Sequence, residues 1–241
     1  MVSTAADVAL GRAVSRERSM YVRAALVAAL IVFAGFAPTY YLKSVFGTPD
    51  LTALKHVHGI VMTAWFALFA TQAWLVSAHN VRLHRKLGVV GVVLAVLVVV
   101  VGMQLGIASA RAGATPLPDI PPLVFLVMPV GELVIFATLF TAAIAMRNRP
   151  AWHKRFMLLA SVGILSPAFA RIPFVASGGP PAFFGFTDLV ILACIAFDTV
   201  KNRRLHPAFA AGFVWVLVCQ FGRIAVAQTP QWMEFARWLV G

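Results

Sequence analysis

Seven long hydrophobic segments run through this chain, and they limit its fold more than any other feature. Each is long enough to cross the roughly 30 Å hydrocarbon layer of a bilayer as a helix. In that layer only helices and closed barrels satisfy all of their backbone polar groups. We expect spans at residues 20–42, 56–78, 87–110, 122–146, 155–177, 183–200 and 207–228. The sequence therefore predicts an all-α, polytopic membrane protein whose seven-helix bundle is one transmembrane domain, residues 20–228.

The composition agrees with this class. The 241 residues are 61% hydrophobic and only 12% charged, whereas soluble domains carry about 25% charged residues. No sizeable soluble domain fits beside the helices, so the lipid bilayer is the expected partner. The isoelectric point of about 11.1 comes from basic residues that flank the helices, so no nucleic-acid partner is expected. Cys194 and Cys219 lie within hydrophobic segments, where a structural disulfide is not expected.

The basic residues are distributed unequally between the two sides of the predicted bundle. Cytoplasmic loops of membrane proteins carry the excess of Lys and Arg. One set of flanks holds fourteen of the 20 basic residues: Arg12, Arg16, Arg18, Arg23, Arg82, Arg85, Lys86, Arg147, Arg149, Lys154, Arg155, Lys201, Arg203 and Arg204. This places the N-terminus inside, with residues 1–19 as a cytoplasmic segment, and the C-terminus outside. We expect a multi-pass protein of the bacterial inner membrane whose first helix is not cleaved as a signal peptide.

The final stretch, residues 229–241, differs from the spans. Thr229 is suited to cap a helix and Pro230 to its first turn. Trp232, Phe235 and Trp238 then fall on one side. This pattern predicts a short helix that lies in the periplasmic membrane interface.

Four charged residues interrupt the hydrophobic segments: Glu132, Arg171, Asp188 and Arg223. Ions within the hydrocarbon layer are costly and usually functional. Counting along the helices at 1.5 Å per residue places these groups between the midplane and the outer third, with Gln104 and His58 at a similar level. We expect a polar pocket in the outer half that binds a ligand or a proton. The alternative is two structural ion pairs, Glu132–Arg171 and Asp188–Arg223.

The histidines suggest a second kind of site. His84 and His153 open the third and fifth helices on the same side, so they meet the depth condition for two axial ligands of one haem. His58 could face Met128 nearer the outer side. The alternative is that the histidines are interfacial residues at helix ends. No Cys or carboxylate cluster joins them, so no metal-ion site is expected.

Short motifs around these histidines carry a resemblance. The patterns are His58-x-x-x-Met62-x-x-Trp65, Leu83-His84-Arg85-Lys86-Leu87-Gly88 and Trp152-His153-Lys154-Arg155-Phe156-Met157. They resemble uncharacterised bacterial polytopic inner-membrane families of unknown function. More distantly, residues 56–176 are similar to the ascorbate-type transmembrane b cytochromes. That resemblance implies haem b, with His58, His84 and His153 as ligands. The fourth helix offers Met128 and no His.

Three functions remain open at this level. The chain lacks the phosphate-loop, H-E-x-x-H, G-x-S-x-G and C-x-x-C motifs, and whether it is an enzyme stays open. We favour a membrane-embedded cofactor-binding or redox protein that uses b-type haem, quinone or a small hydrophobic ligand. The first alternative is a proton-coupled carrier or small-molecule binder built on the four intramembrane charges. The second is a structural subunit of a larger membrane complex.

Overall fold

The computed structural model describes the backbone of residues 5–115 and 120–241, and side chains from residue 19 onward. The described residues form helices and no strands. In chain order the elements are α1 (Ala5–Phe36), the π-helix η1 (Ala37–Tyr41), α2 (Ala53–Ser77), α3 (Val81–Arg111), α4 (Pro122–Phe125), α5 (Val127–Ala145), α6 (Pro150–Val162), α7 (Ser166–Phe169), α8 (Pro173–Ala176), α9 (Gly179–Asn202), α10 (Pro207–Val226) and α11 (Pro230–Val240).

In the described part of the chain, six helices are long and apolar enough to cross a membrane. They are Ser19–Tyr41, Ala53–Ser77, Val81–Arg111, Pro122–Ala145, Gly179–Asn202 and Pro207–Val226. These six match six of the seven segments expected from the sequence. The all-helical, multi-pass membrane class is therefore confirmed.

The expected span 155–177 is not one continuous helix. It divides into α6, α7 and α8, with non-helical residues at 163–165 and 170–172. Pro167 has no N–H to donate one turn back to Gly163, and its ring clashes with that carbonyl. Pro173 pushes Ile172 into an extended conformation, with φ −83° and ψ 118°, which ends the next turn. Two prolines six residues apart thus divide this segment.

Side-chain bonds show how the interrupted segment runs. At the start of α6, His153 Nδ1 bonds to the Ala143 carbonyl at the end of α5, 2.8 Å away. Further along, the Ser166 hydroxyl of α7 lies 3.1 Å from the Thr187 hydroxyl, early in α9. Segment α6–α8 therefore runs antiparallel to α5 and to α9.

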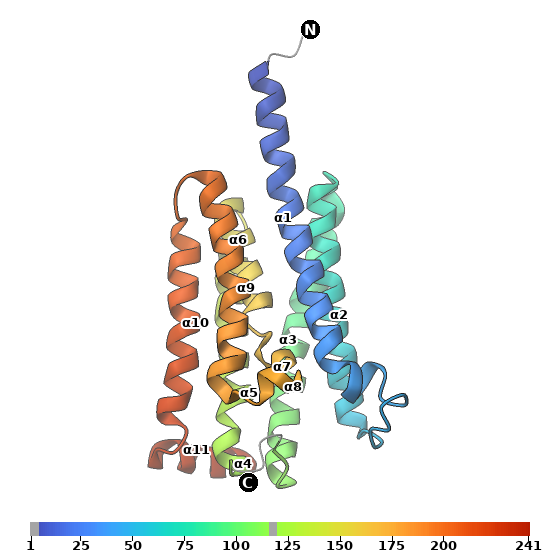
Figure 1. Ribbon diagram of the computed structural model, residues 1–241, viewed down its shortest axis with the longest axis vertical. Coiled ribbons are helices and arrows are strands. Elements are labelled where there is room, and N and C mark those ends of the chain that lie inside the picture. Colours follow the sequence, from blue (N-terminus) through green and yellow to red (C-terminus); the bar gives the residue numbers. More distant parts are fainter. Residues whose placement is uncertain (1–4, 116–119) are drawn as a thin grey trace.

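The bundle has two ends (Figure 1), and they differ in the charge of their exposed side chains. We call the end that carries turns 78–80, 146–149 and 203–206 the basic end, since Arg82, Arg85, Lys86, Arg147, Arg149, Arg203 and Arg204 are all exposed there. The helix α1 extends beyond the other helices at this end. At the opposite end α11 lies across the bundle.

Polar caps define several helix starts. Thr52 accepts a bond from the Lys55 amide at α2, and Asn80 accepts one from the Leu83 amide at α3. Thr229 caps α11 by accepting from the Trp232 amide, as the sequence predicts. The Trp232 indole N–H then donates to the Leu123 carbonyl over 2.9 Å. This bond and the bond from Arg111 to the Val240 carbonyl hold α11 against α4 and α3.

Candidate functional site

Three of the charged side chains inside the bundle and one amide gather at one place, which we call the polar centre: Glu132 of α5, Asp188 of α9, and Gln220 and Arg223 of α10. Arg223 Nη1 donates to Glu132 Oε1 over 2.8 Å and to the Met128 carbonyl over 2.9 Å. Both side chains of this ion pair are less than a tenth exposed. The pairing therefore differs from the Glu132–Arg171 pair expected from the sequence.

A glycine and an aromatic ring shape the space around Arg223. A Cβ placed on Gly131 would lie 2.8 Å from Arg223 Cδ, closer than real contacts allow. Gly131 thus leaves room for the arginine to cross α5 and reach Glu132. On its other side the guanidinium lies 4.4 Å from the centre of the Phe184 ring, at a distance typical of a cation–π contact. Contacts from α5 and α9 therefore fix Arg223, which itself belongs to α10.

Asp188 joins the polar centre without a direct ion pair. Its Oδ1 accepts a bond from Gln220 Nε2 over 3.0 Å, and it interacts electrostatically with Arg223. Asp188 is partly exposed, whereas Gln220 is only 1% exposed. The expected Asp188–Arg223 pair is therefore replaced by a contact through the amide of Gln220.

Three of the residues expected in the same site lie elsewhere. Arg171 donates to the Pro167 carbonyl over 2.6 Å and stacks 4.1 Å from the Phe36 ring centre. It thereby caps the end of α7, since basic side chains readily bond the last carbonyls of a helix. Gln104 is exposed on α3, because residues at equal depth can face different directions. His58 lies close enough to Arg171 for an electrostatic interaction.

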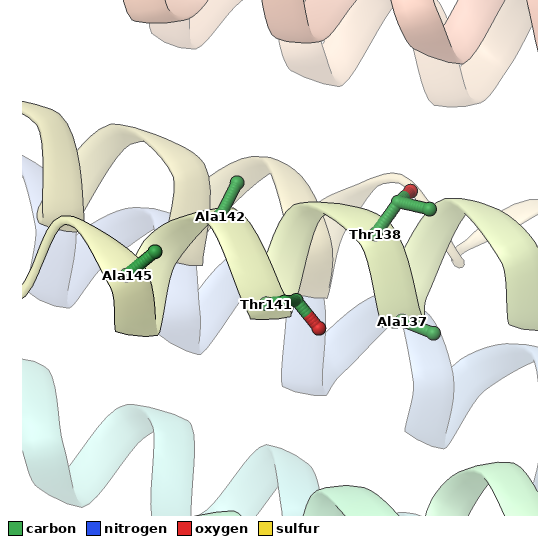
Figure 2. Close-up of a pocket in the computed structure, with 5 residues that line it drawn as sticks. All are labelled: Ala137, Thr138, Thr141, Ala142 and Ala145. Atoms are coloured by element: carbon green, nitrogen blue, oxygen red, sulfur yellow. The ribbon is translucent and has the colours of Figure 1, made fainter.

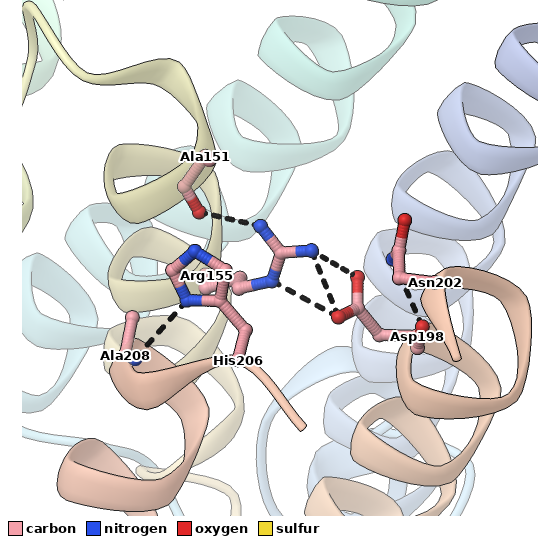
Figure 3. A network of polar contacts seen from close by, with 6 residues as sticks. All are labelled: Ala151, Arg155, Asp198, Asn202, His206 and Ala208. Carbon is pink, nitrogen blue, oxygen red and sulfur yellow. Dashed lines mark hydrogen bonds and ion pairs between the residues drawn. The ribbon is translucent and has the colours of Figure 1, made fainter. Parts of the chain in front are cut away.

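A second buried ion pair was missed by the sequence analysis (Figure 3). Arg155 of α6 bonds to both carboxylate oxygens of Asp198 on α9, with distances of 3.0, 2.7 and 2.8 Å. Their side chains are 4% and 0% exposed. The sequence pattern predicts Arg155 in the cytoplasmic flank and gives no role to Asp198. Asp198 is one of only eight acidic residues in the chain, and its position inside an apolar segment was the available signal.

This pair has a complete set of partners. Arg155 Nη1 donates to the Ala151 carbonyl over 2.7 Å, and the guanidinium stands 5.7 Å from the Phe209 ring centre. His206 lies beside it (Figure 3), and its Nδ1 accepts the Ala208 amide at the start of α10. Burial, followed by the charge of Arg155, lowers the pKa of His206 below its usual 6.5. The arrangement holds α6, α9 and α10 together at the basic end.

The two histidines expected to bind haem lie near one another. The His84 ring of α3 and the His153 ring of α6 have centres 6.4 Å apart and planes at 80°. A carbonyl oxygen can only accept, so the bond to Ala143 makes His153 Nδ1 the donor and leaves Nε2 free to bind a metal. His84 Nδ1 is buried without a hydrogen-bond partner.

The separation of the two histidine rings suits two imidazoles that share one metal. Two imidazoles that share one metal, at about 2 Å each, have ring centres roughly 6 Å apart. A Cβ on Gly88, one turn after His84, would meet only Gln72 Nε2 at 4.0 Å. That distance is an ordinary van der Waals contact, so the Gln72 side chain lies against α3 one turn from His84. Among the described residues no group of three or more His, Cys, Asp or Glu could hold a metal ion.

The second expected ligand pair finds less support. His58 Nδ1 is buried without a hydrogen-bond partner, while its neighbour Arg171 brings a positive charge toward the ring. Met128 packs between the two hydrophobic clusters of the bundle. We therefore build on the His84–His153 pair, whose ring centres lie 6.4 Å apart.

Two hollows lie outside these sites. One, of about 470 Å³, follows α5 and is lined by Ala137, Thr138, Thr141, Ala142 and Ala145 (Figure 2). The Trp215 indole N–H of α10 donates to Thr138 over 2.7 Å beside it. The other, of about 460 Å³, is lined by Val81, Arg82 and Arg85 at the basic end. Neither contains the residues of the polar centre or the histidine pair.

Comparison with known proteins adds no family. No protein-family model matches the chain, and no curated protein or solved structure matches it. Its function is therefore argued from the two constellations described above.

Proposed function

We propose that this chain is a redox protein of the bacterial inner membrane that carries b-type haem between α3 and α6. The observation that carries this proposal is the approach of His84 and His153, with ring centres 6.4 Å apart. The carbonyl of Ala143 orients His153 in the way that second-shell acceptors orient metal-binding histidines. Gln72 supports the other side, since its amide donates to the His84 carbonyl over 3.2 Å.

The bound haem would supply one-electron transfer, and the residues of this chain would hold it and limit access of water. Trp65 and Phe136 pack edge to face, 4.8 Å between ring centres, and are each 3% exposed or less. This aromatic layer of α2 and α5 is part of the apolar core between the histidines and the polar centre. A membrane-soluble electron partner such as a quinone fits a chain with little surface outside the bilayer.

The proposal includes a topology of seven crossings. Segment α6–α8 would serve as the interrupted seventh crossing, because α5 and α9 run in the same direction. The excess of exposed Arg and Lys at the basic end supports a cytoplasmic position for that end. The N-terminus is then inside and α11 lies in the periplasmic interface, where Phe235 and Trp238 are exposed as in other interfacial helices.

An absorption spectrum tests the haem assignment. Full-length protein, purified in detergent from cells that synthesise haem, is expected to show a Soret band that is lost in His84→Ala and in His153→Ala. His56→Ala is the matched control, because His56 is exposed at the opposite end and should leave the band unchanged. A folded but colourless preparation, or a band that persists in both variants, would falsify the assignment.

A further inference from the structure

The polar centre contains buried atoms that nothing in the described chain satisfies. Arg223 Nε and Nη2 and Gln220 Oε1 lie without a hydrogen-bond partner, and Glu132 Oε2 has no partner beyond the nearby Ser166 hydroxyl. The three residues are 4%, 7% and 1% exposed. Buried polar atoms in folded proteins are almost always bonded to protein or to ordered water. Two donors and two acceptors at one place match water, which donates and accepts, better than an anion or an apolar ligand.

The open edge of Arg223 is a specific recognition surface. Nε and Nη2 form the side of a guanidinium that binds two oxygen atoms at once. In Arg155 the same two nitrogens bond to Asp198. In Arg223 only Nη1 is occupied, by Glu132 and the Met128 carbonyl. The edge that binds a carboxylate at the basic end is thus free in the polar centre.

The charges of the polar centre do not balance. Among the residues that the structure describes, two carboxyl groups, Glu132 and Asp188, share one cation, Arg223. The other groups that face them add no charge: the Cys219 thiol of α10 interacts with Glu132 and Arg223, and α7 contributes the hydroxyl of Ser166. Arg171 is directed to Pro167 and Phe36 instead. A second ionised carboxylate in an apolar interior has no counter-ion, which strongly disfavours it.

We propose that the polar centre is a hydrated proton-binding site. One proton is held by the Glu132–Asp188 pair as a carboxylic O–H, and water fills the open edge of Arg223. Glu132 and Asp188 each interact with Arg223, and the proton resides on one of these two carboxyl groups. It exchanges through Asp188, because that residue is partly exposed whereas Glu132 and Arg223 are enclosed. The site does not depend on haem.

Infrared spectroscopy of the full-length protein in lipid tests this directly. The wild-type protein at neutral pH is expected to show the C=O stretch of a protonated carboxylic acid, shifted to lower frequency in D₂O. Either Glu132→Gln or Asp188→Asn should remove that band, because one carboxylate then balances Arg223. Asp50→Asn, which alters an exposed loop carboxylate, is the control and should leave the band intact.

The wild-type spectrum alone can overturn the proposal, even if a variant fails to fold. Absence of a D₂O-sensitive acid band in the wild type shows that both carboxyls are ionised. A band that survives in both variants places the proton elsewhere and also rejects the site. Because the measurement needs no Soret band, a colourless protein would refute the haem proposal and leave this one standing.

Discussion

Two buried arginines occupy similar surroundings at the two halves of the bundle, yet they are satisfied differently. Arg155 and Arg223 each stack on a phenylalanine ring and each lie within 2.8 Å of a carboxylate oxygen. Arg155 uses all three nitrogens on Asp198 and a backbone carbonyl. Arg223 uses one nitrogen and leaves two unpartnered. The first site is complete without any other molecule, and the second is not.

The comparison separates structural from chemical roles for intramembrane charge. A bidentate pair with one charge of each sign holds α6 against α9 and requires nothing more. A one-cation, two-carboxyl centre with open hydrogen-bonding positions can bind protons and water. The four predictions below test this difference, from the largest expected effect to the smallest.

Asp198→Ala is expected to lower the free energy of unfolding by about 3–5 kcal/mol, because it leaves Arg155 buried and unpaired. Glu132→Gln should cost clearly less, since Asp188 remains near Arg223 and the glutamine carbonyl still accepts. Unfolding in detergent measures both, and Glu234→Ala on exposed α11 is the control. Equal losses for the two variants would contradict the distinction between the sites.

Gly131→Ala is expected to destabilise the protein by about 1–3 kcal/mol, as overpacking of a tight contact does. The added methyl group would overlap Arg223 Cδ and displace the guanidinium from Glu132. Gly222→Ala is the matched control, because a Cβ there meets no atom within 4 Å and alanine is the better helix former. Thermal unfolding of both variants decides whether Arg223 needs this space.

The basic end should weaken as pH falls below about 6.5. The pKa of His206 is lowered in the folded protein, first by burial and then by Arg155. The unfolded chain therefore binds the proton more readily, so the stabilisation is complete above the unfolded pKa and is lost as pH falls through the folded one. Loss of the cap on α10 should cost about 1 kcal/mol. In His206→Asn, which caps without titrating, this dependence on pH should disappear.

The exposed pair Lys43–Asp50 provides the smallest effect. Its atoms lie only 2.6 Å apart, but Asp50 is fully exposed. The hydrogen bond and the charge of Lys43 hold the pKa of Asp50 below its usual 3.8, so any stabilisation exists above that pH and is lost in stronger acid. In Lys43→Ala the Asp50 pKa, followed by NMR titration, should rise toward 3.8 without a measurable change in unfolding. High salt should reproduce this rise in the wild type.

Hydrophobic length is a local property, so the membrane class and six of the spans were predictable from the chain alone. The identity of charge partners was not, because depth follows from counting residues but rotation about a helix axis does not. Gln104 has the expected depth and faces outward. The sequence predicts Arg155 at the start of a span, where arginines contact lipid headgroups, but it lies in the second turn of α6 and pairs with Asp198 of α9 inside the bundle. Pro167 indicates a break in this segment from the sequence alone. The bond from Arg171 to the Pro167 carbonyl could be found only in the folded structure.

The bond from Arg171 to the Pro167 carbonyl has a wider consequence. Where a helix stops, its last carbonyl oxygens lack amide donors, and here a side chain four residues later donates to one of them. The Arg171 guanidinium thus satisfies a backbone carbonyl of its own segment, so its charge gives no evidence of a substrate. Surveys that infer transport or catalysis from arginines inside hydrophobic stretches would count this residue wrongly whenever a proline-induced helix end lies one turn before it.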